Sequence, residues 1–280
     1  MSKAIWAILA VLAMWPLAAV AQDGAVPIYQ PIEKFGSYGA QNVAPGDVLT
    51  ADEVAKFEAA VAGMQRFPPY LYSGCHDRAE AAYRLLPAAL QPKVGKIWVI
   101  GPARYTAAIG GTIHLRATDP ASSKVDWGYH VALEIGTAAG MRVFDPALKP
   151  GVSMTRDEWF ALMKLPSLAI WTTTAGDIYQ FVYGTLDFAG LNGAQVWNGN
   201  ANRYRYFDAD HQIMPDNLAR DAVGMDAIAG TTCQQLRDMA TDPDALYAFL
   251  HQAVDVPAAC AGSVDKFKRE RARWSARLAG

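Results

Sequence analysis

Alternating apolar residues predict a β-hairpin near the middle of the chain. The positions 129, 131, 133 and 135 hold Tyr, Val, Leu and Ile, which is the spacing of a strand with one buried face. A Gly-Thr-Ala-Ala-Gly segment at 136–140 follows and predicts a turn. The return strand at 141–145 stops at Pro146, so the whole segment has the pattern of a hairpin.

The hairpin also predicts a pair of polar side chains. If Ile135 pairs with Gly140, then His130 lies opposite Asp145. Cross-strand partners have Cβ atoms about 4.5–5.5 Å apart, so an imidazole and a carboxylate at these positions can form a hydrogen bond. Such a carboxylate would select the histidine tautomer and stabilise the imidazolium, as the third member of a catalytic triad does. The alternative is a surface His–Asp pair at a strand end.

Apolar residues at helical spacing predict a helix that begins at or near Cys75. They are Ala79, Ala82, Tyr83, Leu85 and Leu86. Ser73 or Gly74 can cap the start of this helix, and Asp77 and Glu80 suit its first turn. Unpaired N–H groups and the helix dipole stabilise a thiolate at a helix start and lower its pKa. The position therefore favours a nucleophilic cysteine over a structural one.

The N-terminus has the pattern of a secretory signal peptide. Lys3 precedes an uncharged stretch at 4–17, and Ala-Val-Ala at 19–21 supplies the small residues that signal peptidase accepts, with cleavage after Ala21. A membrane anchor is the alternative, but the stretch is short of the roughly 20 apolar residues that span a bilayer and contains Pro16. We therefore expect a secreted or periplasmic protein with no integral membrane segment after cleavage.

The remaining pattern divides the chain into four parts. A capping-box sequence at Thr50 begins a helix that we expect to pack on the core. The basic stretch at 264–278 repeats Phe267, Trp274 and Leu278 at helical spacing, and a C-terminal surface helix is favoured there over a site for an acidic partner or a membrane surface. The expected parts are a signal peptide at 1–21, an N-terminal segment at 22–65, a catalytic domain at 66–215 and a helical extension at 216–280.

Composition and charge exclude several classes of protein. The 280 residues are 52% hydrophobic and 19% charged, which is too apolar for a disordered chain. The formal net charge of -2 lacks the basic excess of nucleic-acid-binding proteins. No zinc-ligand, P-loop or dinucleotide-binding motif occurs, so no cofactor and no metal are expected.

The chain has three cysteines: Cys75, Cys233 and Cys260. In an exported protein two of them are expected to form a disulfide, which leaves one thiol unpaired. Cys233 and Cys260 are near each other in the sequence, in its C-terminal quarter. They are therefore the expected disulfide pair, and Cys75 is expected to be free. A free cysteine is often a small buried hydrophobic residue, and the position of Cys75 at a helix start favours a nucleophile instead.

Of the five histidines, His130 has the best pattern for the base. His76 follows Cys75 directly, but helical neighbours point about 100° apart.

Short motifs in a fixed order resemble the bacterial protein-glutaminases, which are secreted enzymes that deamidate glutamine side chains in proteins. The motifs are Gly-Cys-His-Asp-Arg-Ala at 74–79, Lys-Ile-Trp-Val-Ile-Gly at 96–101, Trp-Gly-Tyr-His-Val-Ala at 127–132, Asp-Pro-Ala-Leu at 145–148 with Trp159, and Thr-Ala-Gly-Asp-Ile-Tyr at 174–179. The resemblance covers roughly 67–183. Two positions depart from the family pattern: His76 stands where the family has an aromatic residue, and Glu80 where it has a histidine.

The resemblance implies a fold, an activity and a set of site residues. The fold would be α+β, with a papain- or transglutaminase-like core in which the nucleophile helix packs on an antiparallel sheet. The family triad maps onto Cys75, His130 and Asp145, the residues that the helix and hairpin patterns also select. Candidates for contacts with substrate or oxyanion are Gly74, Trp127 and Tyr129.

The expected function is hydrolysis of the side-chain amide of protein-bound glutamine through a cysteine thioester. Its partners would be proteins or peptides that contain glutamine, and no nucleic acid. A thiol peptidase or a transglutaminase could use the same triad. A non-catalytic secreted binding protein on this fold is an alternative from another class, and the intact set of three residues argues against it.

Overall fold

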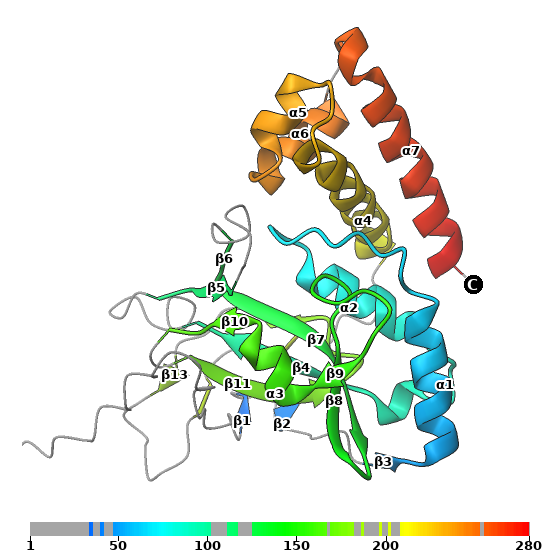
Figure 1. The fold of residues 1–280 in the computed structure, drawn as a ribbon, viewed down its shortest axis with the longest axis vertical. Coiled ribbons are helices and arrows are strands. Elements are labelled where there is room, and N and C mark those ends of the chain that lie inside the picture. The colour runs from blue at the N-terminus through cyan, green and yellow to red at the C-terminus, as the bar shows by residue number, and fades with distance from the viewer. Residues whose placement is uncertain are drawn as a thin grey trace, which may run out of the picture.

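The computed structural model describes residues 34–35, 40–41, 47–101, 111–116, 125–166, 169–181, 186–187, 196–197, 201–202, 208–252 and 255–279. The predicted signal peptide lies outside these residues. The fold is α+β, as the sequence predicts, with helices packed on a largely antiparallel sheet and a group of helices at one end (Figure 1).

The central sheet has the strand order β11-β4-β7-β8-β9, and β3 pairs with β7. The strands are β3 (Val48–Leu49), β4 (Gly95–Ile100), β7 (Tyr129–Thr137), β8 (Gly140–Phe144), β9 (Met154–Thr155) and β11 (Ile170–Ala175). Strand β7 is the longest of them and pairs with β4 on one side and β8 on the other. It is the strand that carries His130.

The other strands are short and form smaller sheets. One small sheet consists of β5 (Ile113–Leu115), β6 (Asp126–Trp127) and β10 (Met163–Lys164). The others are formed by β1 (Lys34–Phe35), β2 (Ala40–Gln41), β13 (Leu186–Asp187) and β14 (Val196–Trp197), and by β12 (Gln180–Phe181) and β15 (Ala201–Asn202).

The hairpin exists, but its predicted register is wrong by two residues. Ile135 pairs with Arg142 instead of Gly140, because the turn contains only Ala138 and Ala139 and both strands extend further than the pattern suggests. A two-residue turn satisfies more backbone hydrogen bonds than the expected five-residue turn. Because side chains repeat every two residues along a strand, a shift of two leaves each side chain on its predicted face.

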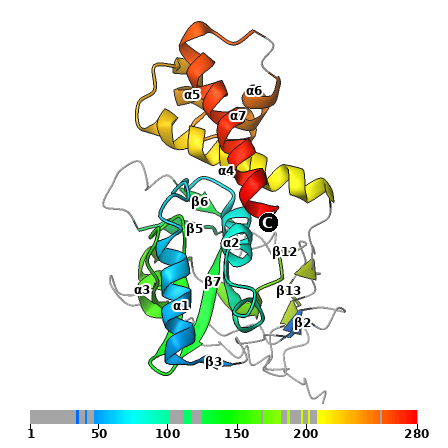
Figure 2. The same cartoon turned by 90° about the vertical axis from the view of Figure 1, so that its right-hand side faces the viewer.

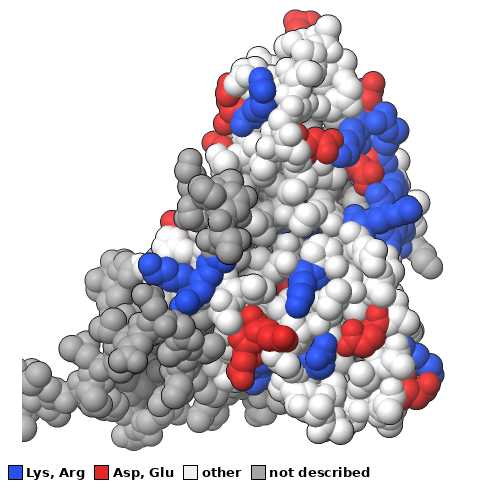
Figure 3. Space-filling model, viewed as in Figure 1, with Lys and Arg blue, Asp and Glu red and all other residues white. Residues whose placement is uncertain are grey.

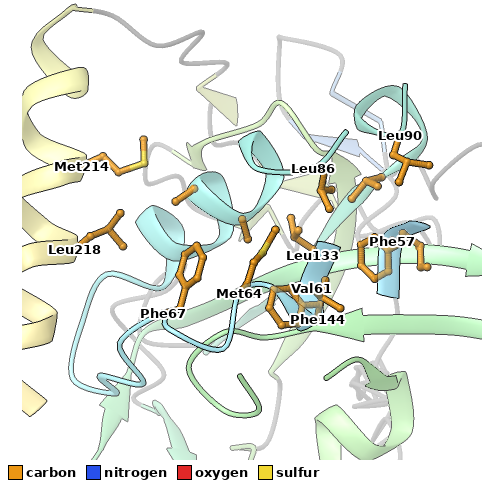
Figure 4. Packing of buried hydrophobic residues seen from close by; sticks show 14 of the residues in the cluster. Phe57, Val61, Met64, Phe67, Leu86, Leu90, Leu133, Phe144, Met214 and Leu218 are labelled. Atoms are coloured by element: carbon orange, nitrogen blue, oxygen red, sulfur yellow. The ribbon is translucent and has the colours of Figure 1, made fainter. Parts of the chain in front are cut away.

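Strand β7 is also buried on both faces, whereas the alternation predicts one buried face. Helices α1 (Ala51–Ala62) and α2 (Cys75–Arg84) cover one face, where Leu133 and Ile135 join their apolar core. Helix α3 (Arg156–Ala161) and the small sheet cover the other face, where Ala132 packs. Figure 4 shows the first of these cores, in which Phe57 and Val61 of α1 meet Leu133 and Phe144 of the sheet.

Helices α1 and α3 begin at capping boxes. The Thr50 side chain accepts a hydrogen bond from the Glu53 N–H, and the Glu53 carboxylate accepts one from the Thr50 N–H. Thr155 and Glu158 form the same arrangement at α3. The prediction of a helix start at Thr50 is therefore confirmed.

The C-terminal helices form a group above α2, which Figure 2 shows from the side. They are α4 (Asp208–Ile228), α5 (Gln234–Met239), α6 (Pro243–Gln252) and α7 (Ala258–Leu278). The predicted disulfide between Cys233 and Cys260 is present, and both cysteines belong to the apolar core of this group. A bridge of this kind typically contributes about 2–4 kcal/mol to stability.

The basic helix α7 lies along one side of this group, and Lys and Arg side chains follow it in Figure 3. Phe267 and Trp274 are buried against the rest of the molecule. Lys266 forms an ion pair with Asp226 of α4, and Arg271 forms one with Asp216 of the same helix. These contacts fit the expected surface helix.

Candidate active site

Helix α2 begins at Cys75, and the preceding glycine is required there. Gly74 is the N-cap residue with φ +72°, a conformation that side chains other than glycine rarely adopt. A Cβ atom on Gly74 would lie 2.9 Å from the Asp221 Oδ2 atom and 3.3 Å from a terminal nitrogen of Arg220. The half-buried Cys75 is free, and the helix start presents its unpaired N–H groups beside the thiol.

His130 and Asp145 form a buried hydrogen-bonded pair. The His130 Nε2 atom lies 2.6 Å from the Asp145 Oδ2 atom, although the two residues are diagonal across the hairpin instead of directly opposite. The other carboxylate oxygen, Oδ1, accepts hydrogen bonds from the backbone N–H groups of Ala147 (3.0 Å) and Leu148 (3.2 Å). Because Asp145 occupies Nε2, the ring nitrogen left for the Cys75 thiol is Nδ1, which is buried and has no hydrogen-bond partner among the described residues.

Two tryptophans hold the His130 ring in place. The Trp127 ring stacks on it with centroids 4.2 Å apart and an interplanar angle of 8°. The Trp159 ring stacks at 5.8 Å, and its Nε1–H donates a 2.8 Å hydrogen bond to the Asp145 Oδ2 atom. Trp127 in turn donates from Nε1 to the backbone oxygen of Leu71, four residues before Cys75. The His130 ring is therefore fixed by packing as well as by its hydrogen bond to Asp145.

The electrostatics of the site favour a thiolate beside an imidazolium. Burial alone would raise the pKa of Cys75, but the nearby imidazoles of His130 and His76 lower it from 9.0 to about 6. Burial alone would lower the pKa of His130, but Asp145 and Cys75 raise it from 6.5 to about 9. For Asp145, His130 and its hydrogen-bond donors outweigh burial and hold its pKa below the ordinary value.

His76 is a second imidazole beside the Cys75 thiol, which the helical spacing did not predict. Its Nδ1 atom lies 2.9 Å from the Tyr129 hydroxyl oxygen, and its Nε2 atom lies 3.5 Å from a carboxylate oxygen of Asp77. The ring also makes an edge contact with Tyr179. Burial alone would lower the pKa of His76, but Asp77 and Cys75 raise it. The only sequence signal was the departure from the family's aromatic residue at this position.

We predict that His76→Phe moves the thiolate titration of Cys75 to higher pH, because one of the two imidazoles that stabilise the thiolate is lost while the aromatic packing is retained. The measurement is the rate of Cys75 alkylation by iodoacetamide as a function of pH. His251→Phe is the matched control, because His251 lies 3.3 Å from Asp216 in the C-terminal helices. An unchanged titration in His76→Phe would contradict the role assigned to this ring.

The structure thus brings together Cys75, His130, Asp145 and the three candidate contact residues, Gly74, Trp127 and Tyr129. His114 lies on β5, opposite Asp126 of β6. Asp77, beneath His76, accepts hydrogen bonds from the Tyr179 hydroxyl (2.7 Å) and the Asn217 amide (3.0 Å). Such an arrangement can activate a thiol for attack on a carbonyl carbon and can deliver a proton to the leaving group.

Part of the chain is similar to a known protein family. Residues 55–163 match a family model described as glutaminase. We call this stretch, which is similar to the glutaminase family, the glutaminase segment. The resemblance drawn from the motifs is therefore confirmed, and the glutaminase segment contains Cys75, His130 and Asp145. It spans less than half of the chain, and the helices α4 to α7 lie outside it. Searches of curated proteins and of solved structures found no match.

Among the residues that the structure describes, no group of three or more His, Cys, Asp or Glu side chains is arranged to hold a metal ion. None of the helices within the described ranges has both the length and the apolar character needed to cross a membrane.

Proposed function

We propose that this protein is a secreted protein-glutaminase that converts protein-bound glutamine to glutamate and ammonia. The observation that carries the proposal is a free cysteine at a helix start beside a buried His130–Asp145 pair, within a segment of the glutaminase family. The family supports amide hydrolysis in general. The choice of protein-bound glutamine rests on the motif resemblance.

In the first half of the reaction, the Cys75 Sγ atom bonds to the carboxamide carbon of the glutamine side chain, and the carbonyl electrons move to oxygen. The backbone N–H of Cys75, at the helix start, is the natural donor to this oxyanion. The His130 imidazolium then gives its proton to the amide nitrogen, the C–N bond breaks and ammonia leaves. A thioester on Cys75 remains, with His130 neutral.

In the second half, His130 takes a proton from water as the water oxygen bonds to the thioester carbon. The C–S bond breaks, glutamate leaves, and the thiolate and imidazolium are restored. Asp145 stabilises the imidazolium in both halves and keeps the proton-transferring nitrogen directed at Cys75. Trp127 and Trp159 keep the ring from rotating between the two proton transfers.

One assay separates this proposal from its alternatives. The full chain is incubated with a glutamine-rich protein, and ammonia, peptide cleavage, crosslinking and mass shifts are measured together. Deamidation gives ammonia and a shift of about +1 Da at glutamine, a peptidase gives new termini, and a transglutaminase gives ammonia with crosslinks to lysine. If none of these products forms, the result indicates the non-catalytic binding protein.

Export through the signal peptide is part of the proposal, and the Cys233–Cys260 disulfide supports it because such bonds persist in oxidising compartments. Expression in a bacterial host followed by N-terminal sequencing of the exported protein should give a chain that starts at Gln22. A retained segment at 1–21 would favour the membrane anchor instead.

We predict a bell-shaped pH dependence of deamidation. The thiolate exists above about pH 6 because that is the pKa of Cys75, and the imidazolium exists below about pH 9 because that is the pKa of His130. Activity should therefore fall on both sides of this window, with the two limbs belonging to the coupled pair. The measurement is kcat/KM for a glutamine-containing peptide from pH 4 to 10. A rate that rises continuously, as for an unassisted thiol of pKa about 8.5, would contradict the ion pair.

A further inference from the structure

The residues just before the nucleophile pack on the C-terminal helices. We call residues 70–74 the nucleophile strap. Tyr70 is fully buried in the apolar core of α4 to α7, and its hydroxyl donates a 2.7 Å hydrogen bond to the backbone oxygen of Ala240. Gly224 of α4 makes room for this ring, since a Cβ atom there would lie 2.5 Å from it. The strap is thus part of the core of the helical group.

A buried charge cluster joins the other end of the strap to α4. Asp221 lies between two arginines: one carboxylate oxygen contacts the Arg78 guanidinium of α2, and the other accepts bonds of 2.7 and 3.1 Å from Arg220. Arg220 also donates a 2.7 Å hydrogen bond to the Ser73 hydroxyl. All three charged side chains are almost fully buried. A buried charge is stable only with its partners, so this cluster has little freedom to shift.

These contacts lie directly behind the catalytic cysteine. Gly74 approaches the Asp221 carboxylate so closely that a Cβ atom would collide with it, and Cys75 is the next residue. Asn217, one turn earlier on α4, binds Asp77 in the first turn of the nucleophile helix. Near the start of the strap, the backbone oxygen of Leu71 accepts a hydrogen bond from Trp127, which stacks on His130. One segment therefore connects α4 with both the nucleophile and its base.

We propose that Asp221 and Arg220 of α4 are positioning residues for Cys75. They hold Ser73, Gly74 and the first turn of α2 so that the thiol meets His130. The inference rests on the proposed function, and it adds to the catalytic unit a helix that lies outside the glutaminase segment. The C-terminal helices thereby act as the scaffold of the nucleophile. A displacement of about 1 Å at a reacting group can cost about a hundredfold in rate.

The test compares Asp221→Asn with Asp226→Asn in the full chain. Both changes replace a carboxylate of α4 by an amide, but Asp226 is near the protein surface and binds Lys266. In Asp221→Asn, the amide N–H₂ group must face one of the two guanidinium groups. Both are hydrogen-bond donors, so that hydrogen bond is lost. We expect kcat for a glutamine peptide to fall about a hundredfold with KM little changed. Asp226→Asn should keep the wild-type values.

Alkylation of Cys75 by iodoacetamide gives a second readout that does not depend on the substrate. We expect the thiolate titration in Asp221→Asn to move up toward the ordinary cysteine value, because the thiol no longer meets His130. Thermal unfolding followed by circular dichroism shows whether the variant is folded at the assay temperature. Should it be unfolded, Arg220→Gln, which removes the bond to Ser73 and leaves the Arg78–Asp221 pair, takes its place in both assays.

The outcomes separate this inference from the proposed function. A folded variant with an upward shift of the titration and a loss in kcat supports the positioning role. An unchanged or downward-shifted titration with unchanged kcat overturns it, and a lower melting temperature alone would then mark a purely structural cluster. If the wild-type chain releases no ammonia but the titration still shifts as expected, the positioning role holds and the proposed function fails.

Discussion

Cys75→Ala should reduce ammonia release to background, a loss on the order of 10⁶-fold in kcat, because no other group in the site can form the acyl intermediate. Cys75 is also the one cysteine outside the disulfide, so its removal leaves the Cys233–Cys260 bridge untouched. The substitution is small and lies at a half-buried helix start, where alanine fits without strain. The measurement is ammonia production from a glutamine-rich protein together with the circular dichroism spectrum of the variant.

The control for this variant is intact substrate binding. Cys75→Ala should still bind a glutamine peptide, because the groups around the thiol remain, and isothermal titration can measure this. Deamidation at the wild-type rate by Cys75→Ala would disprove the proposed mechanism as a whole. Peptide mapping that found Cys75 in a disulfide would do the same.

Asp145→Asn should lower kcat by on the order of 10⁴-fold, with the protein still folded. Asp145 accepts four hydrogen bonds: its Oδ1 atom binds two backbone N–H groups, and its Oδ2 atom binds Trp159 and His130. An asparagine has only one oxygen, so its N–H₂ group must replace an acceptor. If it faces His130, the Nε2 atom must be unprotonated, and the proton then sits on Nδ1. A neutral ring in this tautomer cannot take the proton of Cys75.

Asp126→Asn is the matched control, since Asp126 is exposed on β6. It should retain wild-type activity. The pH profile gives a second criterion: in Asp145→Asn the basic limb should move to lower pH, because the carboxylate that raises the pKa of His130 is gone. Full activity of Asp145→Asn combined with an inactive Asp126→Asn would require another carboxylate partner for His130.

Local patterns predicted individual elements well. The capping box at Thr50 and the start of the nucleophile helix at Cys75 depend on residues within one helical turn, and both are found. The hairpin was predicted from its period of two, and its strands are present. The predicted register was wrong because the alternation of apolar and polar residues does not show the length of the turn. That length depends on how far the two strands pair. The His130–Asp145 contact survives the error because a shift of two preserves the face.

Long-range contacts were beyond the reach of these patterns. Helical spacing alone places His76 poorly to act on the thiol, but Tyr129 of β7 and Asp77 hold its ring at the site. The buried pair of Arg78 and Asp221 joins residues 143 positions apart, and no spacing rule predicts such a pair. The double burial of β7 follows from α3 and the small sheet, whose placement the alternation in a single strand cannot show.

The sequence by itself determined a free cysteine at a helix start, a histidine on a strand with an aspartate just after the neighbouring strand, and a disulfide between the two remaining cysteines. Each of these depends on local periodicity or on a simple count. Only the tertiary structure decided the strand register, the second imidazole at the thiol and the connection of the nucleophile to α4. These depend on which surfaces bury one another, and burial requires partners for every charge that it removes from water. That requirement acts between distant residues, so it becomes visible only once the chain is folded.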